Sequence, residues 1–446
     1  MREIHQKNTI RYYLLILLAL AFLFFTGDFG LIDVQKTAIV MAVGIDREED
    51  TFIITSQIAI PQASKQGKAT ETVQLVSRGN TVAEAFEEIN AKTGWYPKLV
   101  FCRLIVLGEK AAEQNTFDAL DFFLLDEYMS DNCLLATCDG PAKDLLNVAA
   151  LVDPSGSIAM QKVLSPHAER VGAVLPSTLR EFAIGYYSES KSAFLPILKT
   201  QPQQEHVGGS QNGGSSGGSS SESSSSGESG SSSESGSSSS SESSQSSSQS
   251  GGSGSSGEQS GSSGGSGGSG GSGSSGDKPV FSASETALFV GGKRVGKLSK
   301  DETFAFSAVK QELRLAAYSV ETEEATCTLT VRRNSPNTKF KVGKDGRATY
   351  RVNLTMTAGL LDYSKALSRE KAADAGDVPS GTFEAAEKRL LGQIHTTFEK
   401  CRAVGCDLFG IVEQLQKHHN RRFEELKDEA LKNAILHVSV KFQNVR

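Results

Sequence analysis

Residues 291–298, which read GGKRVGKL, come closest in this sequence to a motif with known chemistry. Their glycine and lysine spacing is that of a phosphate-binding loop, but Leu298 stands where that loop needs the Ser or Thr that binds magnesium. Such a loop also needs a helix directly after its lysine, so that backbone N–H groups meet the phosphates. The flanking residues, 287–290 and 295–298, favour strands instead. We therefore interpret the segment as the turn of a hairpin.

The remaining polar side chains form no recognisable catalytic or metal-binding set. His418 and His419 are adjacent, and neighbouring residues on a helix do not share a face as metal ligands would. Acidic pairs such as Glu48 with Glu49 are interpreted as surface charge, and there is no G-x-S-x-G, HExxH or spaced Cys/His motif. The sequence therefore predicts a protein that is not an enzyme, with no catalytic, cofactor-binding or metal-binding residues.

The six cysteines lie mostly within apolar runs, and none belongs to a CxxC pair. This pattern favours buried single thiols. Two close pairs leave disulfides open in an exported chain, Cys133 with Cys138 and Cys401 with Cys406, although a helix across the second pair would make its geometry poor.

Trp95 and Tyr96 follow the first expected helix and have two interpretations. They could pack in the core, or they could project as an anchor toward a partner. We expect them in the core because large aromatic side chains usually bury most of their area.

The charge balance argues against nucleic acid as a partner. The formal net charge is −6, from 46 Lys+Arg against 52 Asp+Glu. A chain with this balance has no broad basic field to attract a phosphate backbone.

The N-terminal region, residues 1–30, reads as a signal or anchor segment. An apolar run at residues 12–25 follows three basic residues, which is the order of an export signal. Fourteen apolar residues are short for a bilayer span, but further apolar residues up to Ile32 could complete an uncleaved anchor. The positive-inside tendency leaves the N-terminus in the cytoplasm and the rest of the chain on the extracytoplasmic face of a membrane.

The next region, residues 31–205, reads as an N-terminal α+β domain. Two β-rich runs within residues 36–60 flank a polar turn and predict a hairpin. Thr81 begins a capping-box pattern that starts a helix, and Gly94 is placed to end that helix. Alternating strands and helices follow at residues 99–107, 116–125, 133–138 and 141–150. Helices and strands mixed without strict alternation predict an α+β class, multidomain, with mixed or antiparallel sheets and packed helices.

Two further regions complete the chain. Residues 206–279 are dominated by Ser, Gly, Glu and Gln, so they lack the apolar surface that would offset the entropy of ordering, and we expect a disordered insertion. Residues 280–446 read as a C-terminal α+β region, which could divide into two subdomains. Its strands are expected at 286–290, 325–333, 338–342, 347–357 and 435–442, with a long helix at 382–404 and an amphipathic segment at 408–415.

Six landmarks occur in an order that resembles the C subunits of spore germinant receptors, the GerAC family of spore germination proteins. They are AIVMAVGID at 38–46, KLVFCRLIVLGE at 98–109, LDFFLLD at 120–126, AKDLL at 142–146, ALFVGGKRVGKLSKDET at 287–303 and DLFG at 407–410. No single piece is diagnostic. Their joint order extends the resemblance over residues 30–200 and 280–445.

The resemblance implies a receptor subunit outside the cytoplasm of a dormant spore. Such a subunit joins the membrane A and B subunits at the inner spore membrane and helps to couple nutrient sensing to germination. Nutrient recognition in these receptors is attributed mainly to the B subunit, so no ligand pocket is assigned here. An exported cell-wall-processing enzyme and a structural envelope protein remain as alternatives.

Asp28 marks a departure from the pattern of this family. Its members are usually lipoproteins whose signal sequence ends in a Thr-Gly-Cys type box, and counting back from Ala38 without gaps places Thr26, Gly27 and Asp28 there. Asp28 cannot form a thioether with a lipid. We therefore expect no lipidation and a retained apolar anchor, and we interpret the Ser/Gly tract as an insertion relative to the family.

Overall fold

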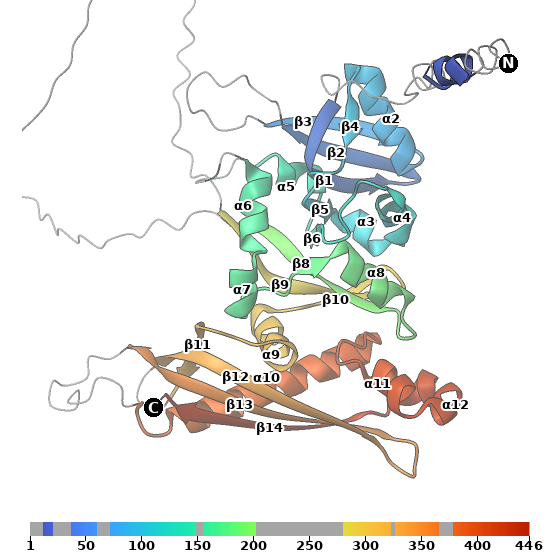
Figure 1. Ribbon diagram of the computed structural model, residues 1–446. Coiled ribbons are helices and arrows are strands. Elements are labelled where there is room, and N and C mark those ends of the chain that lie inside the picture. Colours follow the sequence, from blue (N-terminus) through green and yellow to red (C-terminus); the bar gives the residue numbers. More distant parts are fainter. Residues whose placement is uncertain are drawn as a thin grey trace, which may run out of the picture. The chain divides into compact units, whose positions relative to one another are not determined.

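Two β-sheets with packed helices make up the part of the chain that the computed structural model describes (Figure 1), which confirms the α+β class. The described residues are 12–20, 37–59, 72–148, 153, 155–201, 280–322, 326–364 and 378–445. Asp28 and the expected insertion at 206–279 lie outside them. Residues 12–20 form a short helix with exposed side chains. None of the helices within these ranges combines the length and apolar character that crossing a bilayer requires.

The first sheet has the strand order β10-β9-β8-β6-β5-β1-β2-β3, with β4 beside β1 and β7 beside β6. Strands β1, β5, β6 and β8 run parallel to their neighbours in this group, whereas β2, β3, β9 and β10 pair antiparallel. The strands are β1 Thr37–Glu48, β2 Thr51–Ala59, β3 Thr72–Gly79, β4 Tyr96–Lys98, β5 Leu104–Leu107, β6 Leu134–Cys138, β7 Ser177–Thr178, β8 Ser192–Gln201, β9 Val280–Val290 and β10 Lys293–Leu298.

Helices cover both faces of this sheet. One face packs against α2 Val82–Thr93, α3 Glu109–Glu113, α4 Phe117–Leu125 and α8 Leu179–Tyr187. The other packs against α5 Ala142–Leu146, α6 Gly156–Val163 and α7 Pro166–Arg170. Thr81 accepts the Glu84 N–H at 3.1 Å, and Gly94 ends α2 with a positive φ, so both expected helix boundaries are confirmed.

The expected strand at 99–107 is shorter in the structure because the chain turns within it. Strand β1 pairs in parallel first with β4 and then with β5. Between these two pairings the Cys102 N–H donates to the Leu99 carbonyl at 2.8 Å and closes a tight turn. Val100 and Phe101 therefore lie at the tip of a turn at the edge of the sheet.

The second sheet has the order β11-β12-β13-β14 and one face covered by helices. Its strands are β11 Ala316–Glu321, β12 Thr326–Val342, β13 Ala348–Tyr363 and β14 Ile435–Asn444, and its helices are α9 Lys300–Lys310, α10 Thr382–Val404, α11 Ile411–His418 and α12 Asn420–Ala430. The strands expected separately at 325–333 and 338–342 are one continuous strand, β12. The terminal strand β14 pairs in parallel with β13, so the sheet is mixed.

The pairing of β9 with β8 joins the segments of the chain that precede and follow the insertion. Strand β9 follows the insertion in the sequence, yet it pairs antiparallel with β8, the last strand before it. Residues on both sides of the tract therefore build one sheet, and α9 leads from there to the second sheet.

Candidate functional site at the charged edge of the first sheet

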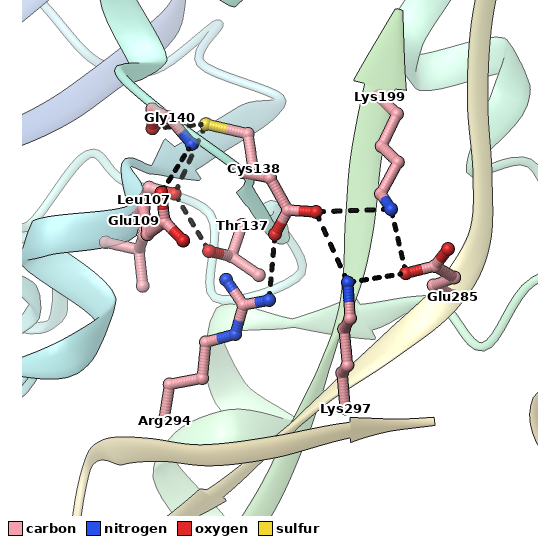
Figure 2. A network of polar contacts seen from close by, with 10 residues as sticks. Leu107, Glu109, Thr137, Cys138, Gly140, Lys199, Glu285, Arg294 and Lys297 are labelled. Atoms are coloured by element: carbon pink, nitrogen blue, oxygen red, sulfur yellow. Dashed lines mark hydrogen bonds and ion pairs between the residues drawn. The ribbon is translucent and has the colours of Figure 1, made fainter. Parts of the chain in front are cut away.

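Charged side chains gather where the parallel strands of the first sheet end. The carboxyl ends of parallel strands share one edge, which is where open α/β sheets usually place functional groups. Asp46 in β1, Glu109 after β5, Asp139 after β6 and Lys199 in β8 stand at this edge. Glu285, Arg294 and Lys297 reach it from β9 and β10, and Figure 2 shows their side chains converging with Lys199.

Asp139 is the centre of an ion-pair network. One of its carboxylate oxygens lies 2.8 Å from Arg294 Nη2, and the other lies 3.2 Å from Lys199 Nζ and 3.7 Å from Lys297 Nζ. Glu285 completes the network at 2.8 Å from Lys199 Nζ and 3.3 Å from Lys297 Nζ. Each of the three cations is therefore paired with at least one carboxylate.

The pKa shifts in the network agree with this pairing. Partial burial alone would raise the pKa of Asp139, but hydrogen bonds from Arg294 and Lys199 outweigh it and hold that pKa below its ordinary value. Burial likewise opposes the charged form of Lys199, yet its two carboxylate partners raise its pKa. Both shifts favour the charged forms of Asp139 and Lys199.

Asp46 uses the same edge to cap helix α5. Its two oxygens accept the N–H groups of Ala142 at 2.7 Å and Lys143 at 2.9 Å. Burial raises the pKa of the Asp46 carboxyl, against the two backbone hydrogen bonds that lower it. A Cβ atom on Gly108 would lie 1.9 Å from Asp46 Oδ1, so a glycine there is required for the carboxylate to reach the helix.

Two cavities of about 400 and 430 Å³ flank the start of α5 and share Pro141 and Asp144 in their walls. Cys138 lines the second, but burial raises the pKa of its thiol well above the usual range. Within the described part of the chain, no group of three or more His, Cys, Asp or Glu side chains is placed to hold a metal ion. The arrangement is that of a clamp, in which paired charges hold β9 and β10 against β6 and β8.

We expect Asp139→Asn to lower the unfolding free energy by about 2 kcal/mol, because Arg294 would lose the carboxylate that pairs with it among the described residues while its side chain stays 12% exposed. Urea unfolding of the full-length protein in detergent micelles measures this change. Asp345→Asn serves as the matched control, since its pair with Arg347 spans 3.8 Å between exposed side chains and should change stability by less than about 0.5 kcal/mol. Equal effects of the two substitutions would contradict the clamp.

A second junction joins the first sheet to the C-terminal helices at residues 407–410, the last of the six sequence landmarks. The buried Asp407 carboxylate accepts the N–H groups of Ile411 at 2.9 Å and Val412 at 2.7 Å at the start of α11. Its own N–H donates to the Ser192 hydroxyl in β8 at 2.9 Å. Phe409 packs edge-on against Phe398 of α10 at 5.2 Å between ring centroids, and also against Phe306 and Tyr350. The landmark is therefore a structural corner between the two sheets.

The structure places the motifs singled out from the sequence at separate positions. Gly291 and Gly292, with φ of 57° and 77°, form the hairpin turn between β9 and β10, which confirms a turn and not a phosphate loop. His418 ends α11 and His419 follows it. All six cysteines are buried and unpaired, as expected from their apolar surroundings.

Trp95 and Tyr96 correct the expectation of core packing. They are 37% and 45% exposed at the edge of the first sheet. Short strand β4 pairs with the beginning of β1, and the two rings are only partly covered there.

Sequence reasoning singled out the segment at 291–298, which contains Arg294 and Lys297, but it did not predict an ion-pair network. Two other members of the network carried a signal, since Lys199 and Glu285 are charged residues that adjoin apolar strand segments at 193–198 and 286–290. Nothing in the sequence indicated that Asp139 meets Arg294, because only the fold brings residues 155 positions apart into contact.

Comparisons with known proteins cover both sides of the insertion. Residues 31–200 match the family described as "Spore germination protein N-terminal domain", and residues 284–446 match "Spore germination B3/GerAC like, C-terminal". No curated protein shows a significant sequence match. Among solved structures, the crystal structure of the GerBC protein matches with a TM-score of 0.47 and 14% identity, over 91% of this chain and 97% of that chain. The two family matches, in this order along one chain, show that the protein belongs to the GerAC family of spore germination proteins.

Proposed function

We propose that this protein is the non-enzymatic C subunit of a spore germinant receptor. It lies on the extracytoplasmic face of the inner spore membrane, assembles with membrane A and B subunits, and couples nutrient sensing to germination. The observation that carries the proposal is the match of residues 31–200 and 284–446 to the two domains of the spore germination family. The role involves no cofactor, metal or nucleic acid.

The chemistry of the charged edge supports a scaffold more than a catalyst. Asp139 pairs with three cations, and two of them, Arg294 and Lys199, hold its pKa below the ordinary value. Groups that are fully paired in this way lack the free base or nucleophile on which hydrolysis depends. The same ion pairs hold together the strands that precede and follow the insertion, which suits a subunit that joins partner subunits.

The membrane attachment in this proposal comes from the apolar run at residues 12–25. Asp28 stands at the usual position of the lipid-bearing cysteine and provides no thiol for a thioether. The mature chain therefore keeps residues 1–30 as its anchor. We interpret the tract at 206–279 as an insertion that can be removed with little loss of folding, because long surface insertions add little closure entropy.

Purification from spore membranes tests this function. A tag placed within residues 206–279 leaves both sheets untouched, and we expect the A and B subunits to copurify with the tagged chain. Intact mass measurement of the same sample should show residues 1–30 present and no lipid attached. An unrelated, equally tagged inner-membrane protein from the same spores is the control.

Two other results of the purification would overturn the proposal. Recovery of the chain with wall-processing enzymes would favour an exported enzyme. Recovery of the chain alone, with germination unchanged in a deletion strain, would favour a structural envelope protein.

A further inference from the structure

The amino edge of the first sheet, opposite the charged edge, carries exposed apolar side chains. Trp95 and Tyr96 are 37% and 45% exposed, and Val100 and Phe101 are 44% and 52% exposed. We call these four residues the amino-edge patch. Single exposed apolar residues are ordinary, but neighbouring aromatic ones mark a contact surface.

The backbone holds the amino-edge patch together. Tyr96 begins β4 and pairs with Thr37, the first residue of β1. The turn closed by the Cys102 N–H and the Leu99 carbonyl, 2.8 Å apart, presents Val100 and Phe101 next to β4. The four residues of the patch are therefore positioned by a paired strand and by a hydrogen-bonded turn.

The position of the patch in the chain indicates what covers it. The chain enters the sheet at Thr37, beside Tyr96, and the apolar run at 12–25 precedes it by the eleven residues 26–36. Eleven residues extend at most about 40 Å. An anchor in the bilayer therefore keeps Thr37, and with it the amino-edge patch, within about 40 Å of the membrane, which lets the patch reach the lipid headgroups.

The composition of the patch fits a lipid interface. Trp and Tyr combine an apolar ring with a polar atom and concentrate at the boundary between headgroups and acyl chains. Lys98 lies between the two halves of the patch, and its Nζ is 4.8 Å from the centroid of the Tyr128 ring, so this cation–π contact places a positive charge beside the apolar side chains. The ion-pair network occupies the opposite edge of the sheet. A sheet that rests on the membrane through the amino-edge patch would therefore hold these charges away from the lipid.

We propose that the amino-edge patch docks on the phospholipid bilayer, with the rings of Trp95 and Tyr96 among the headgroups and Val100 and Phe101 at the start of the acyl chains. The docking rests on the membrane anchor of the proposed function. It orients the first sheet with its charged edge away from the membrane. The anchor and the patch are then two independent attachments of one domain.

Trp95 is the only tryptophan of the chain, so its fluorescence reports this contact without a label. The experiment uses the full-length protein reconstituted in phospholipid vesicles that contain lipids brominated at defined acyl positions. We expect bromine near the headgroup to quench Trp95 more than bromine near the bilayer centre. Aqueous acrylamide should quench Trp95 at least two-fold less in vesicles than in detergent micelles.

The variant Val100→Asp/Phe101→Asp separates docking from anchoring. It should stay in the vesicles through residues 12–25 but lose the quenching by brominated lipid. Leu361→Asp is the matched control, since Leu361 is 61% exposed at the end of β13 and far in sequence from the patch, and its quenching should equal that of the unmodified protein.

Several outcomes would overturn the docking. Trp95 could stay open to acrylamide in vesicles, or the double variant could keep the lipid quenching. A separate set of vesicles that also contains the A and B subunits tests for a protein partner: shielding of Trp95 in that set alone, without lipid quenching, would identify such a partner instead. The first set of vesicles contains only lipid and this chain, so its result is independent of whether the receptor subunits copurify.

Discussion

Replacing Asp407 with alanine is expected to lower the unfolding free energy by about 2 to 4 kcal/mol. The carboxylate is 5% exposed and accepts two backbone N–H groups at the start of α11, and its loss leaves both donors buried without a partner. The same corner contacts β8 through Ser192, so the damage reaches the junction between the two sheets. Urea unfolding of the full-length protein in micelles measures the change.

Thr81→Ala is the control for the Asp407 substitution. Thr81 also caps a helix, with its hydroxyl 3.1 Å from the Glu84 N–H, but it does so at the surface. Loss of an exposed cap costs about 1 kcal/mol. Equal losses for the two substitutions would show that burial of the corner adds nothing.

The pH dependence gives a second measure of the same corner. Burial raises the pKa of Asp407 to about 6 from 3.8, against the backbone hydrogen bonds that lower it. Between these values the folded protein holds a proton that the unfolded chain has released, so this contribution to stability is complete below pH 4 and is lost as the pH rises through 6. The loss amounts to about 3 kcal/mol.

Comparison with Asp407→Asn isolates this titration from all the others. The difference in unfolding free energy between the unmodified protein and the variant should fall between pH 4 and 6 and stay flat above pH 7. Other carboxylates titrate equally in both proteins and cancel. Parallel curves over the whole range would mean that Asp407 is not desolvated in the folded state.

Replacing Gly108 with alanine is expected to cost about 3 kcal/mol. The new Cβ would lie 1.9 Å from Asp46 Oδ1, so the carboxylate must leave its two hydrogen bonds to the start of α5. Thermal and urea unfolding both measure the loss. In an Asp46→Ala background the clash is gone, and the added cost of Gly108→Ala should fall to about 1 kcal/mol.

Gly392→Ala provides a control of opposite sign. Gly392 lies within α10, and a Cβ there would meet no atom within 4 Å. Alanine in a helix interior should therefore stabilise the protein by about 0.5 to 1 kcal/mol.

Additive effects of Gly108→Ala and Asp46→Ala on the unfolding free energy would contradict the assigned contact between these two positions.

These substitutions give physical reasons for three of the family landmarks. Asp46 ends the first of them and caps α5, whose residues 142–146 are another. Gly108 lies in the second and makes room for that cap. Residues from these three landmarks, which are far apart in sequence, thus meet at one edge of the first sheet.

Local signals were enough to predict many elements from the sequence. Thr81 and Gly94 bound α2 because a cap and a left-handed glycine act within one turn of the helix. The hairpin turn at Gly291 and Gly292 could be predicted because two adjacent glycines readily adopt the positive φ that a turn between paired strands needs. The long helix at 382–404 followed from its apolar spacing.

The pairing of distant strands was decided only by the tertiary structure. Alternating side chains show that β14 buries one face, but they do not show that its neighbour is β13 or that the two run parallel. Likewise nothing local in β9 indicates that it returns to β8 across the insertion, or that Arg294 meets Asp139 there. Trp95 was misplaced for the same reason, because its exposure depends on which layers cover β4. Local pattern determines which side of an element is buried, whereas the partner that buries it is chosen by long-range packing.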